Sequence, residues 1–446
     1  KYVVEFPSGK YTYDMRFSFG EILWELKNYP EAYEQYLAVV KIDPQGKHSK
    51  QCAEDAIFAA IELVKIEEKE GKVQKRKGST DIEPKELSDW EQKLLSAMDS
   101  FTATYPDSKD TTKWLYESGE LLFSKNLLDK ASERYQTVIA REPRSKQAKN
   151  SAKGIVDALA FRANAKTETK EYELALKDWK ALQSTANSFN NQEGLGNAAF
   201  KKEMFEYYEI ASAKLVEVTF ESSSKGDSDK ITAANGYTEF AKTFPASKKA
   251  DVALNLAAIY YYETNRLADS MDTRATLIAT YPKSKFYSEH IARLGYAHET
   301  IADYPNAIIW YERLFNEDKD HEFAKDAMYT AIVLHDRMGE YDAAIGGIEQ
   351  FMKTYPGDER VKDMPLYIAR IHKKSGDLDK AGKAYYTFFA ESPKSATEEQ
   401  RIFARLQYGK LLKEQGVDSD RLLKYWKTTM AAIERAQAKK QVEPSP

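Results

Sequence analysis

The chain has 446 residues, more than one compact core usually organises, so it forms either several domains or an extended repeat array. Its net charge of −4 excludes the basic surplus that neutralises a phosphate backbone, and nucleic acid is therefore not an expected partner. A single cysteine, Cys52, excludes an intrachain disulfide, and no apolar run reaches the roughly 18–20 residues that a membrane helix needs.

Prolines at recurring steps mark the ends of the predicted helices. Helix formers such as Ala, Leu, Glu and Lys are plentiful, and steps of 37 residues, or twice that number, separate most of the prolines concerned. Proline cannot continue a helix, and the Ser or Asp that follows it can cap the next one, so each proline is expected to separate two helices. This ladder consists of Pro7, Pro44, Pro106, Pro143, Pro245, Pro282, Pro356 and Pro393.

Small and aromatic residues upstream of these prolines repeat with constant offsets. The first complete set is Gly20, Ala32, Tyr36, Val39 and Pro44. The three sets that share its spacing are Gly119, Ala131, Tyr135, Val138 and Pro143; Gly295, Ala307, Tyr311 and Leu314; and Ala369, Ala381, Tyr385, Phe388 and Pro393. A small residue on each of two helices lets their backbones approach, while the aromatic residue fills the space around the crossing.

These sets resemble the tetratricopeptide-repeat (TPR) family over nearly the whole chain, with a step of 37 residues in place of the usual step of about 34. The resemblance implies an all-α fold, a right-handed α-solenoid of about ten TPR-like helix pairs. It also implies a protein that binds other proteins.

In chain order, residues 1–14 read as the end of a preceding repeat. Because the end of a solenoid needs a polar cap, we expect the native protein to extend further toward its N-terminus. Residues 15–143 read as N-terminal TPR-like repeats with a polar insertion at 67–86, whose basic run Lys72–Lys77 is expected to be a solvated loop. Residues 144–245 read as irregular, lengthened helix pairs.

The C-terminal half is more regular. Residues 246–393 read as 37-residue repeats, and residues 394–440 read as a capping helix pair. Residues 441–446 are expected to be a disordered tail.

Three histidines, His298, His335 and His372, also lie 37 residues apart. Equivalent atoms of adjacent repeats lie on the order of 10 Å apart, too far for metal bonds of ~2 Å, so we expect interhelix hydrogen bonds, with a pH-sensitive joint as the alternative. The sequence has no nucleophile elbow, phosphate loop or zinc-protease motif. It therefore predicts no enzyme, no catalytic residue, no metal and no cofactor.

The resemblance implies that the first helix of each pair, helix A, lines a concave groove that binds an extended or helical segment of a partner protein. The alternative for each aromatic residue is packing against the neighbouring repeat. Glu21 and Glu120 stand where chaperone-binding TPR domains carry Asn, so that specificity is not expected. The candidate groove residues are Phe17, Glu21, Trp24, Tyr116, Glu120, Phe123, Tyr262, Tyr296, Tyr329, Arg337, Arg370, Lys373 and Lys374.

The cassette Thr280-Tyr-Pro-Lys-Ser284 and its counterparts resemble those of bacterial envelope TPR proteins, of the outer-membrane assembly lipoprotein and Tol-Pal-associated types. That resemblance implies a scaffold in the periplasm or on the periplasmic face of the outer membrane, with any membrane anchor in a preceding segment. The alternatives are a cytosolic adaptor or co-chaperone, and a substrate-holding accessory module of an enzyme.

Overall fold

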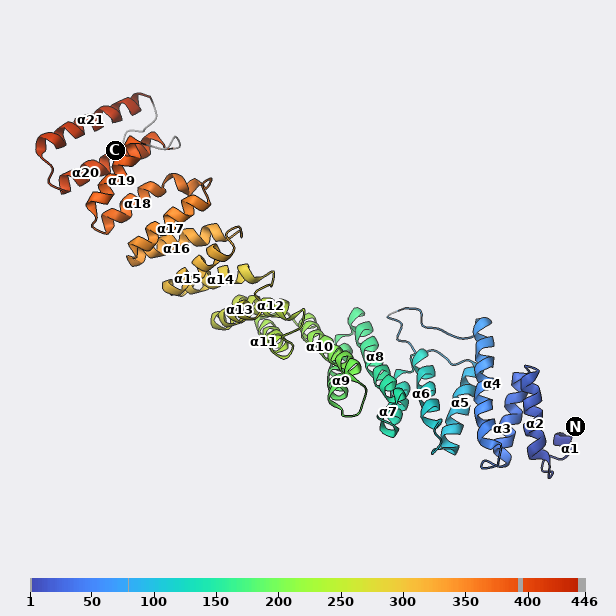
Figure 1. Cartoon of the computed structure of the whole chain (residues 1–446). Helices are drawn as coiled ribbons and strands as arrows, with labels where there is room; N and C mark the ends of the chain where they lie inside the picture. The colour runs from blue at the N-terminus through green and yellow to red at the C-terminus, as the bar shows by residue number, and fades with distance from the viewer. Residues whose placement is uncertain (1, 79, 392–395, 440–446) are drawn as a thin grey trace. The chain divides into compact units, whose positions relative to one another are not determined.

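The computed structural model describes residues 2–78, 80–391 and 396–439, and this part of the chain is all-α (Figure 1). It divides into two compact units, Lys1–Ser247 and Lys248–Pro446. The finer division predicted from the sequence stays a prediction, and the predicted tail, residues 441–446, lies outside the described residues.

Unit 1 contains the first half of the helices. They are α1 (Tyr2–Glu5), α2 (Thr12–Glu25), α3 (Tyr29–Ile42), α4 (Ser49–Lys69), α5 (Asp89–Thr104), α6 (Thr111–Ser124), α7 (Leu128–Arg141), α8 (Lys146–Glu168), α9 (Tyr172–Asn191), α10 (Ala198–Glu221) and α11 (Asp227–Thr243).

Unit 2 contains the remaining helices, including one short 3-10 helix. They are α12 (Ala250–Glu263), α13 (Leu267–Thr280), α14 (Tyr287–Thr300), α15 (Tyr304–Glu317), α16 (Ala324–Met338), α17 (Tyr341–Thr354), η1 (Glu359–Lys362), α18 (Met364–Lys374), α19 (Leu378–Ala390), α20 (Glu398–Glu414) and α21 (Ser419–Ala438).

Ten helix pairs make up the described part of the chain. Each even-numbered helix from α2 to α20 packs against the odd-numbered helix that follows it, and we call the two members helix A and helix B. Helices A of neighbouring pairs also touch, as α6 touches α8 and α14 touches α16. This pairwise packing is that of a TPR-like solenoid, which confirms the predicted all-α class.

Glycine on helix A and tyrosine on helix B pack closely in three of the pairs. A Cβ atom built on Gly20, Gly119 or Gly295 would lie 2.8, 2.7 or 2.5 Å from the facing tyrosine ring, closer than packed atoms approach. The pairs are Gly20–Tyr36, Gly119–Tyr135 and Gly295–Tyr311. The small and aromatic residues of the sequence pattern therefore meet as predicted.

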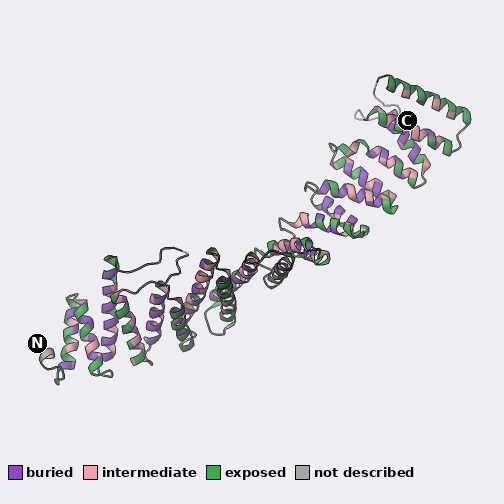
Figure 2. Ribbon diagram, turned by 180° about the vertical axis from the view of Figure 1, so that it is seen from behind, coloured by how far each residue is buried: buried purple, intermediate pink, exposed green. Residues whose placement is uncertain are grey.

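Buried residues gather where helices meet, and the last helix is an exception (Figure 2). In α21 only Thr429 and Ala436 are buried, so most of this helix faces solvent.

The proline cassettes end helices as predicted, but they start the next helix differently. Ser145 accepts a hydrogen bond from the backbone N–H of Ala148 and caps α8. After Ser108 and Ser284, by contrast, a backbone turn intervenes and the next helix begins three residues later. The prediction that these two serines cap the following helix is therefore wrong.

The predicted polar insertion, 67–86, is shifted and is not simply solvated. Helix α4 continues to Lys69, and Glu67 is 7% exposed. The Glu67 carboxylate accepts hydrogen bonds from the Ser88 hydroxyl and from the Trp90 N–H. The loop thus runs from Glu70 to Ser88, closed at its base by this buried carboxylate.

The basic run of the loop packs against the turn between α6 and α7 (Figure 1). Arg76 lies over the Phe161 ring, 4.1 Å from its centroid, and donates to the Phe123 carbonyl and to the Asn126 side chain. The backbone N–H of Lys85 donates to the Lys125 carbonyl at 2.8 Å. The last carbonyls of a helix lack intrahelical donors, and the loop supplies them. The expectation of a solvated loop is therefore wrong for Arg76.

Candidate functional site

In unit 1 the predicted aromatic residues of α2 pack within the chain. The Phe17 ring stacks on His48 with centroids 3.9 Å apart, and Trp24 meets Tyr29 edge to face at 5.2 Å. Glu21 accepts a hydrogen bond of 2.8 Å from the Tyr36 hydroxyl. All three predicted groove residues of α2 therefore have partners within the chain.

Helix α6 shows the same arrangement. Tyr116 is half-buried beside Tyr135, and Phe123 lies under the Arg76 guanidinium, 5.3 Å from the ring centroid. Glu120 is exposed and accepts a hydrogen bond of 2.5 Å from the Tyr135 hydroxyl. The predicted role of these residues in binding stays a prediction, and the structure places most of their rings in contacts within the chain.

Carboxylates on helices A give unit 1 an acidic character. Burial raises the pKa of Glu117 and of Asp157, and the charge of Glu120 adds to both shifts. Burial, with the charge of Glu21 second, raises the pKa of Asp55 to about 6. The Asp55 Oδ2 atom is buried and has no hydrogen-bond partner in the described structure. The sequence could not show this, because only the packing brings the two acids, Glu21 on α2 and Asp55 on α4, close together.

Replacing Asp55 with asparagine should stabilise unit 1 at pH 7.5 and have little effect at pH 4. The folded-state pKa of about 6 exceeds the value of about 4 for a free aspartate, so the unfolded chain ionises first as pH rises. Stability is therefore lost between these two values, and asparagine removes the loss. Thermal unfolding followed by circular dichroism across this range tests the expectation. Asp107→Asn, at an exposed position, is the control. Parallel plots of thermal midpoint against pH for the two variants would contradict the expectation for Asp55.

In unit 2 two of the predicted tyrosines remain open to solvent. Tyr262 on α12 is 47% exposed and Tyr296 on α14 is 50% exposed. Tyr329 on α16 is half-buried because the Arg360 guanidinium covers its ring at 4.9 Å. Of the three predicted tyrosines, Tyr262 and Tyr296 are thus the two that a partner can reach.

A cavity of about 390 Å³ lies between α14 and α16 beside Tyr296. It offers a cation, Arg293, a carboxylate, Glu299, and the tyrosine ring within one hollow. Glu299 accepts a hydrogen bond of 2.7 Å from the Tyr311 hydroxyl, which fixes its orientation. The lining residues are Ala292, Arg293, Tyr296, Glu299, Tyr311, Phe323, Asp326, Ala327 and Thr330.

The two predicted groove lysines of α18 are neutralised by ion pairs. Lys373 pairs with Glu414 at 3.0 Å, and Lys374 pairs with Asp336 at 2.8 Å. These lysines therefore tie neighbouring helices together, because acidic residues distant in sequence lie opposite them. Arg337 and Arg370 are exposed, and neither forms an ion pair within the described residues, although Arg370 lies over the Tyr367 ring at 5.2 Å.

Two of the three spaced histidines, His298 and His335, form hydrogen bonds to acids at the start of helix B. His298 Nδ1 lies 2.9 Å from Asp303, and His335 Nδ1 lies 2.6 Å from Glu340. His335 Nε2 also lies 3.0 Å from Glu312. These are the interhelix contacts expected from the spacing. Within the described ranges, no group of three or more His, Cys, Asp or Glu side chains is arranged to hold a metal ion.

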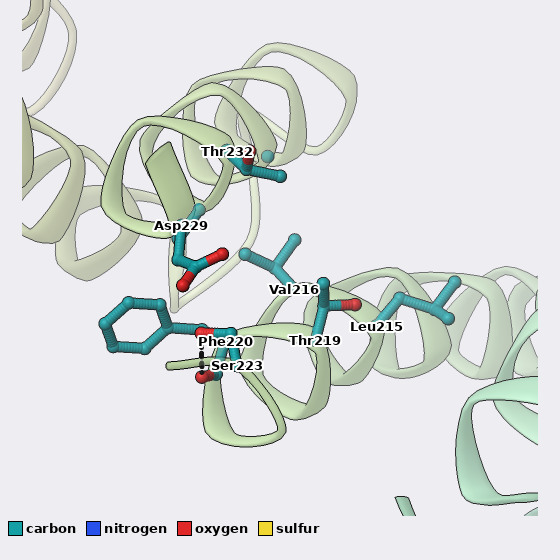
Figure 3. Close-up of a pocket in the computed structure, with 9 residues that line it drawn as sticks. Leu215, Val216, Thr219, Phe220, Ser223, Asp229 and Thr232 are labelled. Carbon is teal, nitrogen blue, oxygen red and sulfur yellow. Dashed lines mark hydrogen bonds between the residues drawn. The ribbon is translucent and has the colours of Figure 1, made fainter. Parts of the chain in front are cut away.

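A small apolar cavity of about 210 Å³ separates α10 and α11 (Figure 3). Leu215, Val216 and Phe220 form one wall. Its acid, Asp229, accepts hydrogen bonds from the Ser224 hydroxyl and the Gly226 N–H and so fixes the start of α11. Nothing in this cavity specifies a ligand.

The fold and the helix A surfaces define an all-α repeat protein whose exposed aromatic and charged groups lie on successive helices. Residues 13–45 match the family described as Tetratricopeptide repeat. This match identifies one TPR repeat within the chain, formed by α2 and α3. No curated protein matches it in sequence. Among the described residues, no helix combines the length and apolar character needed to cross a membrane.

Several solved structures are similar to the chain at low identity. The P58(IPK) TPR domain is 13% identical, with 91% of this chain and 99% of that chain covered and a TM-score of 0.23. The MamA protein is 18% identical, with 53% and 98% covered and a TM-score of 0.26. The C-terminal part of a TPR repeat-containing protein from Cytophaga hutchinsonii is 11% identical, with 70% and 98% covered and a TM-score of 0.25.

Proposed function

We propose that the chain is a non-catalytic scaffold that holds an extended or helical segment of another protein along the helices A of unit 2. The observation that carries this proposal is the exposure of Tyr296 beside the cavity between α14 and α16, together with the exposure of Tyr262 on the preceding helix A, α12. Aromatic rings next to a cavity lined by both positive and negative charges anchor protein segments, since each ring buries a large area while losing little side-chain conformational entropy.

Site-specific photo-crosslinking tests this proposal. A photoreactive phenylalanine analogue at position 296 or 262 should capture a discrete partner in the native cell. The control is position 386, where Tyr386 is 49% exposed on the helix B α19. Equal capture at all three positions, or no capture at 296 and 262, would overturn the proposal.

The free arginines of unit 2 should contribute to the same contact. Replacing Arg337 and Arg370 together with glutamate is expected to weaken binding of the captured partner about tenfold, because exposed charges at the edge of an interface act mainly on association. Binding of the purified partner by isothermal titration calorimetry at two salt concentrations gives the measurement. Lys383→Glu, on the exposed surface of α19, is the matched control and should leave the affinity unchanged.

We also propose a bacterial cell envelope as the compartment. The support is the aromatic-proline-serine cassette, whose resemblance to envelope TPR proteins covers the repeat alone. Fractionation of the native, full-length protein tests it: recovery with the cytosol would contradict the envelope assignment and leave the scaffold proposal intact.

A further inference from the structure

One repeat of unit 2 carries a charged residue in place of its aromatic plug. Arg274 on α13 stands 37 residues before Tyr311, which fills the crossing between α14 and α15. The equivalent of Gly295 is Ala258, and the equivalent of Ala307 is Ser270. The α12–α13 pair thus substitutes a guanidinium and a hydroxyl for apolar packing.

The Arg274 guanidinium is buried without a counterion. Arg274 is 6% exposed, and its Nε donates to the Ser270 hydroxyl oxygen at 3.3 Å. Ser270 in turn donates to the Ala258 carbonyl at 2.8 Å. Within the described residues no carboxylate forms an ion pair with Arg274, and the nearby Glu289 pairs with Arg293 instead. A buried charge is costly unless it is paired, so this arrangement favours an external anion.

The neighbouring histidine cannot supply the missing charge. His290 is fully buried, with Nδ1 3.2 Å from Arg274 Nη1 and Nε2 3.0 Å from Asn255 Oδ1. A neutral ring that accepts at Nδ1 and donates at Nε2 satisfies both contacts. Burial first, then the charges of Arg274 and Arg293, lowers the pKa of His290 to about 3.

The surroundings add positive charge and hydrogen-bond donors. Arg293 lies close enough to act on both groups, and Glu289 sits 3.5 Å from Arg293, so one positive charge remains in excess. Burial, with the charge of Arg293 second, lowers the pKa of Arg274 to about 10. The Asn255 amide and the exposed Tyr262 ring come from α12, on the side that the proposed function assigns to the partner.

We propose that Arg274, Asn255 and His290 form a recognition site for a carboxylate of the bound protein segment, at the junction of α12, α13 and α14. This inference rests on the proposed function and names the chemistry of its partner, a segment that presents an aspartate, a glutamate or a C-terminal carboxylate to this repeat. Arg274 supplies the charge, His290 holds the guanidinium in place and the Asn255 amide donates.

The test uses the whole chain and a defined probe, acetylated and amidated hexaglutamate, with hexaglutamine at equal ionic strength as its neutral match. Hexaglutamate should bind the natural chain, and Arg274→Tyr should weaken that binding at least tenfold. Tyrosine is the residue of the other repeats at this position, so this variant should fold. Arg435→Tyr, at an exposed position on α21, should bind as the natural chain does.

A second variant, Asn255→Asp, replaces the donating amide with a carboxylate that repels an anionic ligand and should abolish hexaglutamate binding. Binding of hexaglutamate that is unchanged in Arg274→Tyr, or no greater than that of hexaglutamine, would overturn the inference. Photo-crosslinking at position 296 distinguishes the two proposals. A partner that is captured equally by the natural chain and by Arg274→Tyr would contradict the carboxylate site alone. Capture of no partner would contradict the scaffold proposal.

Discussion

Replacing Tyr135 with alanine should destabilise the α6–α8 region by about 3–5 kcal/mol, the range measured when large aromatic side chains are removed from cores. Tyr135 is fully buried on α7 and is enclosed by glycine on both sides. A Cβ atom at Gly119 of α6 would lie 2.7 Å from its ring, and one at Gly154 of α8 would lie 2.6 Å away. Because both facing residues are glycines, neither offers a side chain that could fill the space, so the cavity would persist.

The hydroxyl of Tyr135 makes a separate and smaller contribution. It donates to Glu120, and Tyr135→Phe should cost about 1 kcal/mol, because the exposed carboxylate can bind water once the hydroxyl is gone. The difference between the two variants therefore separates the packing of the ring from its hydrogen bond.

Hydrogen exchange read by mass spectrometry is the measurement for both variants, since a repeat array opens locally and a single unfolding midpoint averages over its pairs. Protection should fall in α6, α7 and α8 and stay unchanged in unit 2. Tyr296→Ala, which removes a half-exposed ring, should change stability by less than about 0.5 kcal/mol. Uniform loss of protection along the chain would contradict the assignment of Tyr135 to a local crossing.

The crossings could be predicted from sequence because they are local. Gly119 and Tyr135 lie 16 residues apart, and the same offset recurs in Gly20–Tyr36 and Gly295–Tyr311, so one rule of helix packing covers all three pairs. Helix ends were predictable for the same reason, since proline acts on its own neighbours along the chain.

Whether each aromatic side chain on the surface is exposed or covered could not be predicted, because its exposure depends on groups outside its own helix. Tyr296 stays exposed, whereas Tyr329, 33 residues later on the next helix A, lies under Arg360 from the 3-10 helix η1. Lys373 and Lys374 looked free in sequence, and their acidic partners lie on other helices. Repeat spacing assigns a residue to helix A, and packing decides whether a partner can reach it.

Arg274, by contrast, could have been recognised from the sequence alone. It occupies a position of the repeat pattern, but its side chain is neither small nor aromatic. Aligning α13 with α15 at the 37-residue step places this arginine opposite Tyr311. A departure from a periodic core is informative because the periodic residue would have packed at lower cost in free energy.

Replacing Lys125 with methionine should release the loop between α4 and α5 and destabilise it by about 3–5 kcal/mol, the range found when one partner of a buried ion pair is removed. The Lys125 and Glu91 side chains are 2% and 3% exposed, and Lys125 Nζ lies 2.7 Å from Glu91 Oε1. Lys125 also donates to the Gln74 carbonyl of the loop at 2.8 Å. Methionine of similar length leaves Glu91 buried without its cation.

Trypsin sensitivity of the basic run Lys72–Lys77 measures this release. Because about 1.4 kcal/mol corresponds to a factor of ten, cleavage there should rise by about a hundredfold or more if cutting follows opening of the loop. Lys130→Met, at an exposed site on α7, should leave the rate unchanged.

Adding Glu91→Gln to Lys125→Met should recover much of the resistance. The amide is uncharged, and its oxygen can still accept from the Ser88 N–H, as the Glu91 carboxylate does at 2.9 Å in the N-terminal cap of α5. Recovery in the double variant identifies the stranded charge as the cause of release. If Lys125→Met alone resists trypsin as the natural chain does, the loop is held by Arg76 and Asn126 instead, whose hydrogen bond of 2.8 Å does not involve Lys125.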